Sequence, residues 1–125
     1  MSRNVLITEV AEGDLDNLGF DDTQKVHTLE IALRLEDFDD PEQMVDLDIR
    51  KMSHFYEVRR LLDEGGPLRS EKVQLRFGVV EKDNGDIVIL QITNNHEAPD
   101  VIETVLLEDR YVSYLRTGAA TLLNE

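Results

Sequence analysis

The chain has 125 residues, and 27 acidic side chains against 13 lysines and arginines give it a formal net charge of −14 at pH 7. This length, with a hydrophobic fraction of 41%, predicts one domain, residues 1–125, built around a single core. The absence of cysteine excludes disulfides, thiolate metal sites and cysteine nucleophiles. The longest apolar run, residues 87–90, is far too short for a membrane span or a signal-peptide core, so we expect a cytoplasmic protein.

Most of the charge lies in the first third of the chain. Residues 9–48 carry fourteen carboxylates against Lys25 and Arg34, a local charge of −12, whereas residues 49–125 carry thirteen acids and ten bases. Such a field repels nucleic acid and acidic membranes and attracts cations or basic proteins. Adaptation to high salt is an alternative explanation, but it should acidify the whole surface.

The first half of the chain is expected to contain three strands separated by two acidic loops. The β-branched stretch 4–10 predicts the first strand, and residues 11–24, rich in Asp and Gly, predict a loop. Apolar residues alternate with polar ones over 25–36, which predicts a half-buried strand; they are Leu29, Ile31, Leu33 and Leu35. After a second acidic loop, 36–43, the alternation of Val45, Leu47 and Ile49 predicts a short third strand.

After residue 50 the spacing of the apolar residues changes from two to three and four, and residues 51–62 predict an amphipathic helix. Its stripe has three- and four-residue spacing and is followed by a glycine–proline stop; it comprises Met52, Phe55, Tyr56, Arg59 and Leu62. Next, residues 72–82 and 86–93 flank Asn84-Gly85, the strongest local sign of a hairpin. A two-residue loop there would place Val79 opposite Leu90 and Phe77 opposite Ile92.

A last helix is predicted from about Pro99 to Leu115, because Pro99 and Asp100 suit its first turn and Gly118 suits its end. Its broad apolar set is Val101, Ile102, Val105, Leu106, Val112 and Leu115. Residues 117–125 would form a loose tail. The order βββ-α-ββ-α predicts an α+β fold, with a single antiparallel sheet of about five strands and two helices packed on one face.

The strongest candidate for a metal site is a run of acids around Pro41: Asp37, Asp39, Asp40, Glu42, Asp46 and Asp48. Calcium takes six to eight oxygen ligands, and Asp37, Asp39 and Asp48 match positions 1, 3 and 12 of an EF-hand loop. Pro41 and Glu42 stand where that loop needs an oxygen ligand and a glycine, so the EF-hand template fails. An irregular calcium site and a solvated acidic turn both remain open.

No nucleotide-binding glycine motif and no nucleophile with a base appears in the sequence, so no catalytic residue is assigned. We therefore predict a non-enzymatic interaction or regulatory module without a cofactor, in which the acidic loops bind a basic partner protein. The binding residues are Asp14, Asp16, Asp21, Asp22, Asp37, Asp39 and Asp40. A calcium-binding protein is the alternative, followed by a small enzyme using His96; a homodimer is left open.

Overall fold

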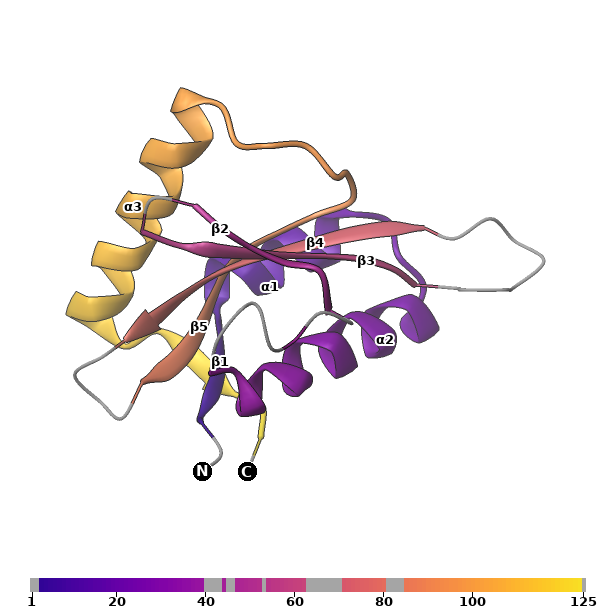
Figure 1. Cartoon of the computed structure of the whole chain (residues 1–125), viewed down its shortest axis with the longest axis horizontal. Coiled ribbons are helices and arrows are strands. Elements are labelled where there is room, and N and C mark those ends of the chain that lie inside the picture. Colours follow the sequence, from indigo (N-terminus) through magenta and orange to yellow (C-terminus); the bar gives the residue numbers. More distant parts are fainter. Residues whose placement is uncertain are drawn as a thin grey trace.

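The computed structural model describes residues 3–39, 44, 47–52, 54–62, 71–80 and 85–124. Within them, one six-stranded mixed sheet, in the order β2-β3-β4-β5-β1-β6, packs with three α-helices (Figure 1). The elements are β1 (Val5–Thr8), α1 (Glu9–Asn17), α2 (Asp22–Leu33), a 3-10 helix (Arg34–Asp37), β2 (Ile49–Lys51), β3 (Tyr56–Leu61), β4 (Lys72–Val80), β5 (Asp86–Thr93), α3 (Val101–Thr117) and β6 (Ala120–Leu122). No helix of this described part is long and apolar enough to cross a membrane.

The α+β class and the single sheet are confirmed, but the details of the sheet are not as predicted. The strands β1 and β5 are parallel, while the other neighbouring pairs are antiparallel. The central strands β4 and β5 are buried on both faces, so both faces need a cover. The prediction that the helices pack on one face is therefore wrong.

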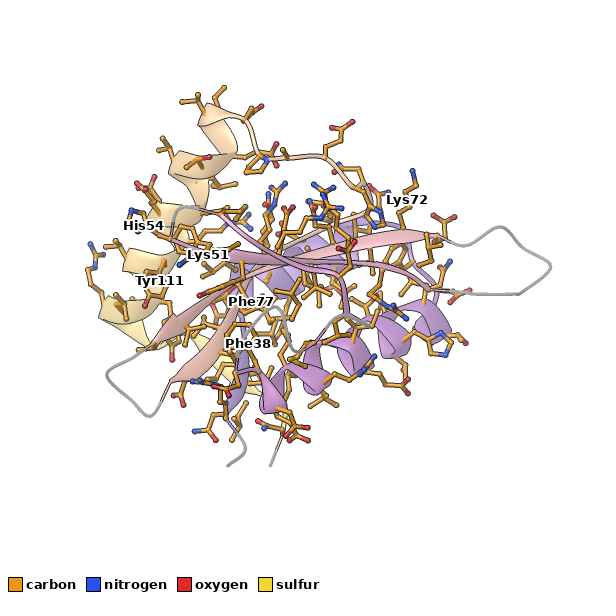
Figure 2. The ribbon with its side chains drawn as sticks, viewed as in Figure 1. Phe38, Lys51, His54, Lys72, Phe77 and Tyr111 are labelled. Atoms are coloured by element: carbon orange, nitrogen blue, oxygen red, sulfur yellow. The ribbon has the colours of Figure 1, made fainter. Side chains whose placement is uncertain are left out.

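The two faces carry separate cores. On one face, Ala11 and Leu15 of α1 and Ala32 of α2 pack with Phe77 and other apolar residues of β1, β4 and β5. On the other face, Leu107 of α3 joins a smaller cluster formed by Phe55, Val80, Val88 and Leu90. Figure 2 shows the same division, with Phe38 and Phe77 on the α2 side of the sheet and Tyr111 on α3.

The predicted loop 11–24 is wrong, because α1 occupies most of it. The helix begins after Thr8, whose hydroxyl accepts a hydrogen bond from the Ala11 amide at 3.2 Å. Glu9 and Glu12 in the first turn stabilise the helix, because their negative charges lie near the positive end of its dipole. Ala11 and Leu15, four residues apart, then bury one side of the helix against the sheet.

The predicted strand 25–36 is also wrong, since α2 and the 3-10 helix cover this segment. Asp21 caps α2 in a capping box, in which Asp21 Oδ1 accepts from the Gln24 amide at 2.8 Å and Gln24 Oε1 accepts from the Asp21 amide at 2.9 Å. The buried residues Thr28, Ala32 and Leu35 recur at four- and three-residue spacing. The segment therefore folds with the three- and four-residue period of a helix and not with the two-residue alternation of its apolar residues that predicted a strand.

The predicted helix 51–62 is wrong, because Lys51 ends β2 and Tyr56–Leu61 form β3. The strand β3 pairs with β4 over six residues, from Tyr56 opposite Phe77 to Leu61 opposite Lys72. Its apolar side chain Val58 faces the larger core, while the intervening Glu57 is buried on the other face. Val45 of the predicted third strand and the glycine–proline stop lie outside the described residues; Leu47 is buried, and β2 begins only at Ile49.

The hairpin strands are confirmed, but the predicted register is wrong. Val79 pairs with Ile87, and Phe77 pairs with Ile89. Because Val80 pairs with Asp86, five residues separate the strands rather than two; Asn84 lies outside the described part, and Gly85 has φ +73°. An irregularity between Arg76 and Phe77 shifts the register further along.

The last helix is confirmed as α3. Asp100 Oδ1 accepts from the Glu103 amide at 2.7 Å, and Gly118 ends the helix with φ +67°. The predicted loose tail is wrong in part, because β6 pairs antiparallel with β1. The Asn124 side chain holds this end in place, since it accepts from the Val5 amide at 2.8 Å and donates to the Arg3 carbonyl at 2.7 Å.

The capping box predicts the effect of a single substitution. We expect Asp21→Ala to lower the free energy of unfolding by about 1 kcal/mol, measured by urea denaturation, because the Gln24 amide loses its acceptor. Asp21→Asn retains an oxygen acceptor and serves as the control. Equal losses in the two variants would show that charge, and not the cap, is what Asp21 contributes.

Candidate functional site

The predicted binding residues that the structure describes lie on or beside α1, α2 and the 3-10 helix, and they differ in their surroundings. Asp14 is largely withdrawn from solvent, with Oδ2 2.7 Å and Oδ1 3.3 Å from the Arg110 guanidinium of α3. Its Oδ2 also accepts from the Ile92 amide at 3.2 Å. This carboxylate therefore connects α1 with β5 and α3.

The neighbouring carboxylates are more open. Asp16 is 3.3 Å from the Lys25 ammonium, with 70% of its side chain exposed. Asp21 caps α2, and Asp22 lies exposed in the first turn of that helix. Since Asp21 keeps one oxygen for the cap, it has less capacity for an external partner than Asp22.

The predicted metal ligands are described only in part, because Asp40, Glu42 and Asp46 lie outside the described residues. Asp37 ends the 3-10 helix and is exposed, as is Asp39. Asp48 lies 3.5 Å from Arg50 and adopts φ 51° just before β2. Among the described residues, no three His, Asp or Glu side chains come together to hold a metal ion.

A buried ionic cluster lies on the α3 side of the sheet. Arg76 of β4 is 1% exposed; its Nη1 donates to Gln91 Oε1 at 2.6 Å and to Glu103 Oε2 at 2.7 Å. Its Nη2 donates to the Glu97 carbonyl at 2.8 Å. One guanidinium therefore joins β4 to β5, to the segment before α3 and to the first turn of α3.

Glu57 of β3 completes the ionic cluster. It is 3% exposed, with Oε1 3.0 Å from Arg59 Nη2 and Oε2 3.6 Å from Arg76 Nε. Glu57 Oε2 and Arg76 Nε make no hydrogen bond, so they face each other as a buried ion pair at longer distance. Arg59 Nε donates to Gln74 Oε1 at 2.9 Å. This cluster was not expected from the sequence, because its pattern predicted a helix at Glu57 and Arg59.

His96, the residue of the enzyme alternative, anchors the segment before α3. Its Nε2 lies 3.2 Å from the Arg60 carbonyl and 3.0 Å from the Val73 carbonyl. Both neighbours are acceptors, so Nε2 donates. The ring therefore ties this segment to the edges of β3 and β4.

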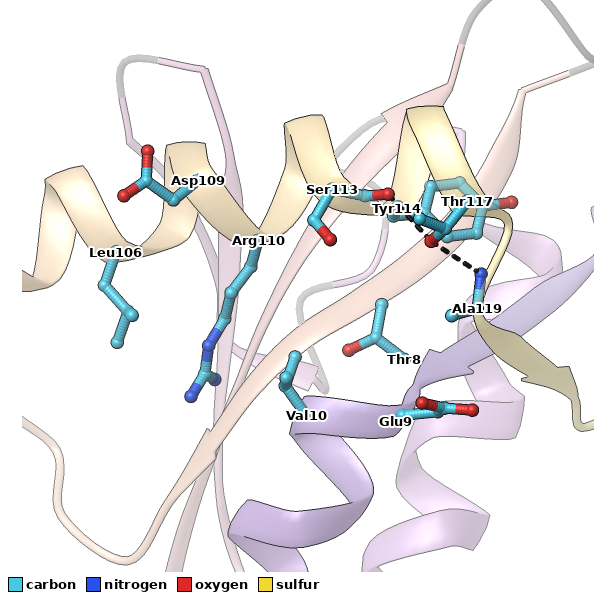
Figure 3. Close-up of a pocket in the computed structure, with 10 residues that line it drawn as sticks. All are labelled: Thr8, Glu9, Val10, Leu106, Asp109, Arg110, Ser113, Tyr114, Thr117 and Ala119. Atoms are coloured by element: carbon cyan, nitrogen blue, oxygen red, sulfur yellow. Dashed lines mark hydrogen bonds between the residues drawn. The ribbon is translucent and has the colours of Figure 1, made fainter.

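A cavity of about 370 Å³ lies between α3 and the junction of β1 with α1 (Figure 3). Its walls include the apolar side chains Val10 and Leu106 beside the hydroxyl of Ser113. The Arg110 guanidinium is already bonded to Asp14 and to the Leu90 carbonyl. The described lining contains no histidine, so it offers Ser113 no imidazole base.

The outer surface of α3 is unusually apolar. All six residues of its predicted apolar set are exposed: Val101 80%, Ile102 79%, Val105 51%, Leu106 37%, Val112 52% and Leu115 54%. The buried residue of the helix is Leu107, which the predicted set omitted. A surface helix normally turns its apolar side to the core, so the exposure of this apolar set on α3 is unusual.

Comparisons with protein-family models, with curated proteins and with solved structures gave no match for this chain.

The buried ionic cluster predicts a strong coupling between two residues. We expect Arg76→Met to lower the free energy of unfolding by about 3 kcal/mol or more, because the buried Glu57 keeps only Arg59 as a nearby cation and the partners of the Arg76 guanidinium lose their donor. Adding Glu57→Gln should recover part of the loss, as measured by urea denaturation of the single and double variants. Strictly additive effects would contradict the coupling.

The calcium alternative has its own test. We expect Asp37→Asn combined with Asp48→Asn to leave the thermal stability in CaCl₂, relative to EDTA, unchanged, as a solvated acidic surface requires. A saturable calcium isotherm in the micromolar range for the natural chain, lost in this double variant, would instead establish the acidic segment as a calcium site.

Proposed function

We propose that this protein is a non-enzymatic binding module that takes a basic partner protein on its α1–α2 layer. The observation that carries the proposal is the excess of exposed carboxylates over exposed cations in residues 3–39. Over residues 3–39, one cation, Arg34, is exposed. The exposed carboxylates of the same segment number seven: Glu9, Asp16, Asp21, Asp22, Glu30, Asp37 and Asp39.

The location of these carboxylates favours a macromolecular partner. They are spread along two helices and the 3-10 helix instead of converging on one point, which suits a partner with several cationic side chains. Such a field also speeds the encounter with an oppositely charged protein. Most of this acidic surface, on α2 and the segment that follows it, lies on the sheet face opposite α3 (Figure 1), whereas Glu9 of α1 lies beside α3 in the cavity between them. A partner bound over α2 and the 3-10 helix leaves α3 free.

A cavity of about 310 Å³ beside α1 and α2 offers this partner an anchoring point. Apolar walls from Leu15 and Leu29 stand beside the carboxylates of Glu12 and Asp16. This combination fits an arginine or lysine side chain, which has an apolar stem and a cationic head. Lys25 lines the same cavity and pairs with Asp16, so an incoming cation would compete with an internal one.

The proposal predicts salt-sensitive capture that depends on the α1–α2 layer. The immobilised chain should retain basic proteins of a cell extract at about 0.01 M ionic strength and release them at about 0.15 M, as the Debye length falls from about 30 Å to about 8 Å. Asp22→Asn with Asp37→Asn should weaken this retention, measured by quantitative mass spectrometry, because both carboxylates are exposed there.

The matched control removes the same charge elsewhere. Glu71→Gln with Glu97→Gln neutralises two exposed carboxylates outside the layer and should leave retention unchanged. Equal weakening by both pairs would show that only total charge matters. Retention that persists at high salt would contradict an electrostatic docking surface.

A further inference from the structure

Four of the six exposed apolar residues of α3 have a similar spacing when the helix is turned end for end. Val101, Val105, Val112 and Leu115 are four, seven and three residues apart, and Glu108 fills the middle position. At about 100° per residue, these five positions fall within about 80° of one another, so they form one stripe, the α3 stripe. In reverse order the spacings become three, seven and four, so Val105 matches Val112 and Val101 matches Leu115 to within one residue. A two-fold interface needs such a self-complementary surface.

The charges of α3 are compatible with self-association even though each chain carries −14. The helix holds Glu103, Glu108 and Asp109 against Arg110 and Arg116, a formal charge of only −1. Five of the seven exposed carboxylates of residues 3–39 belong to α2 and its flanking segments, across the sheet, and Glu9 is the one that lies beside α3. Two copies that meet through α3 therefore keep their most acidic surfaces apart, which reduces their mutual repulsion.

The attachment of α3 to its own sheet leaves the α3 stripe unused. The inner side of the helix supplies Leu107 to the core, Tyr111 to an edge contact with Phe55 at 5.7 Å between ring centroids, and Arg110 to Asp14. Val101 and Val105 lie on the outer side, where they are 80% and 51% exposed. The outer side is thus available without any displacement of the helix.

We infer that α3 is the interface of a homodimer in which two copies pack antiparallel about a two-fold axis close to Glu108. In this arrangement the three- and four-residue spacing lets the apolar side chains interlock as in a coiled coil. Each helix end meets the opposite end of the partner, so the helix dipoles are complementary and Arg116 lies near the acidic first turn. The two copies of Glu108 face each other, which weakens the dimer. This inference does not depend on the proposed function.

Two valines of equal exposure give a matched test. Val112 on α3 and Val26 on α2 are each 52% exposed. We expect the natural chain to dimerise in sedimentation experiments, increasingly so as salt is added. Val112→Asp should produce a folded monomer, judged by circular dichroism, whereas Val26→Asp should remain dimeric. Glu108→Gln should lower the dissociation constant severalfold by removing a like-charge contact.

The cysteine-free chain also allows the geometry to be tested. Glu108→Cys should form a disulfide-linked dimer on oxidation, because the two residues meet near the axis. Val101→Cys should not, since an antiparallel pair separates the two copies by about 20 Å along the helix, far beyond the reach of a disulfide.

Each contrary result would overturn the inference. A natural chain that remains monomeric at high salt and high concentration would do so. So would a dimer that survives Val112→Asp, or a Val101→Cys disulfide that forms as readily as the one at position 108. None of these outcomes bears on capture of basic proteins by the α1–α2 layer, so this inference and the proposed function can fail separately.

Discussion

The position of α3 depends on one buried cation, Arg76. A guanidinium that is only 1% exposed must keep its partners, because an uncompensated buried charge is strongly destabilising. Its partners are Gln91 of β5, Glu103 of α3 and the Glu97 carbonyl before that helix, together with the nearby Glu57. The geometry of these bonds fixes where α3 begins relative to the centre of the sheet.

This cluster also explains why the apolar residues of α3 face outward. The sheet face beneath the start of α3 presents the polar residues Gln74, Arg76 and Gln91. Arg76 donates to Gln91 and to the Glu97 carbonyl, and Gln74 accepts from Arg59 and donates to the same carbonyl. An apolar helix side placed there would gain little burial and would leave polar groups without partners. The apolar part of that face is smaller than the core on the opposite face, and Leu107 of α3 packs against it. The opposite face is apolar throughout its core, so α1 and α2 cover it with apolar residues and display their carboxylates to solvent.

Sequence reasoning succeeded where local signals were unambiguous, as at the Asp100 and Gly118 ends of α3 and in the strands of the hairpin. It failed in residues 25–36 because two periods coexist there, and the buried stripe consists partly of the small residues Thr28 and Ala32. The capping box of Asp21 and Gln24 was the available sign of a helix. The ionic cluster could not be predicted, since its members come from β3, β4, β5 and α3 and meet only through the sheet register. The apolar set of α3 was visible in the sequence, but which side is covered depends on the polarity of the sheet face beneath it.

The separation of acidic and apolar surfaces has a physical consequence for assembly. An apolar patch inside the acidic layer could not approach a second copy without bringing the largest charges together. With the patch on α3, across the sheet, association and binding of a basic partner use different faces and need not compete. A two-fold axis through α3 would point the two acidic layers in opposite directions, so each would bind its own compact partner. Only an extended basic chain, long enough to reach around the dimer, could contact both layers at once and gain from their combined affinity.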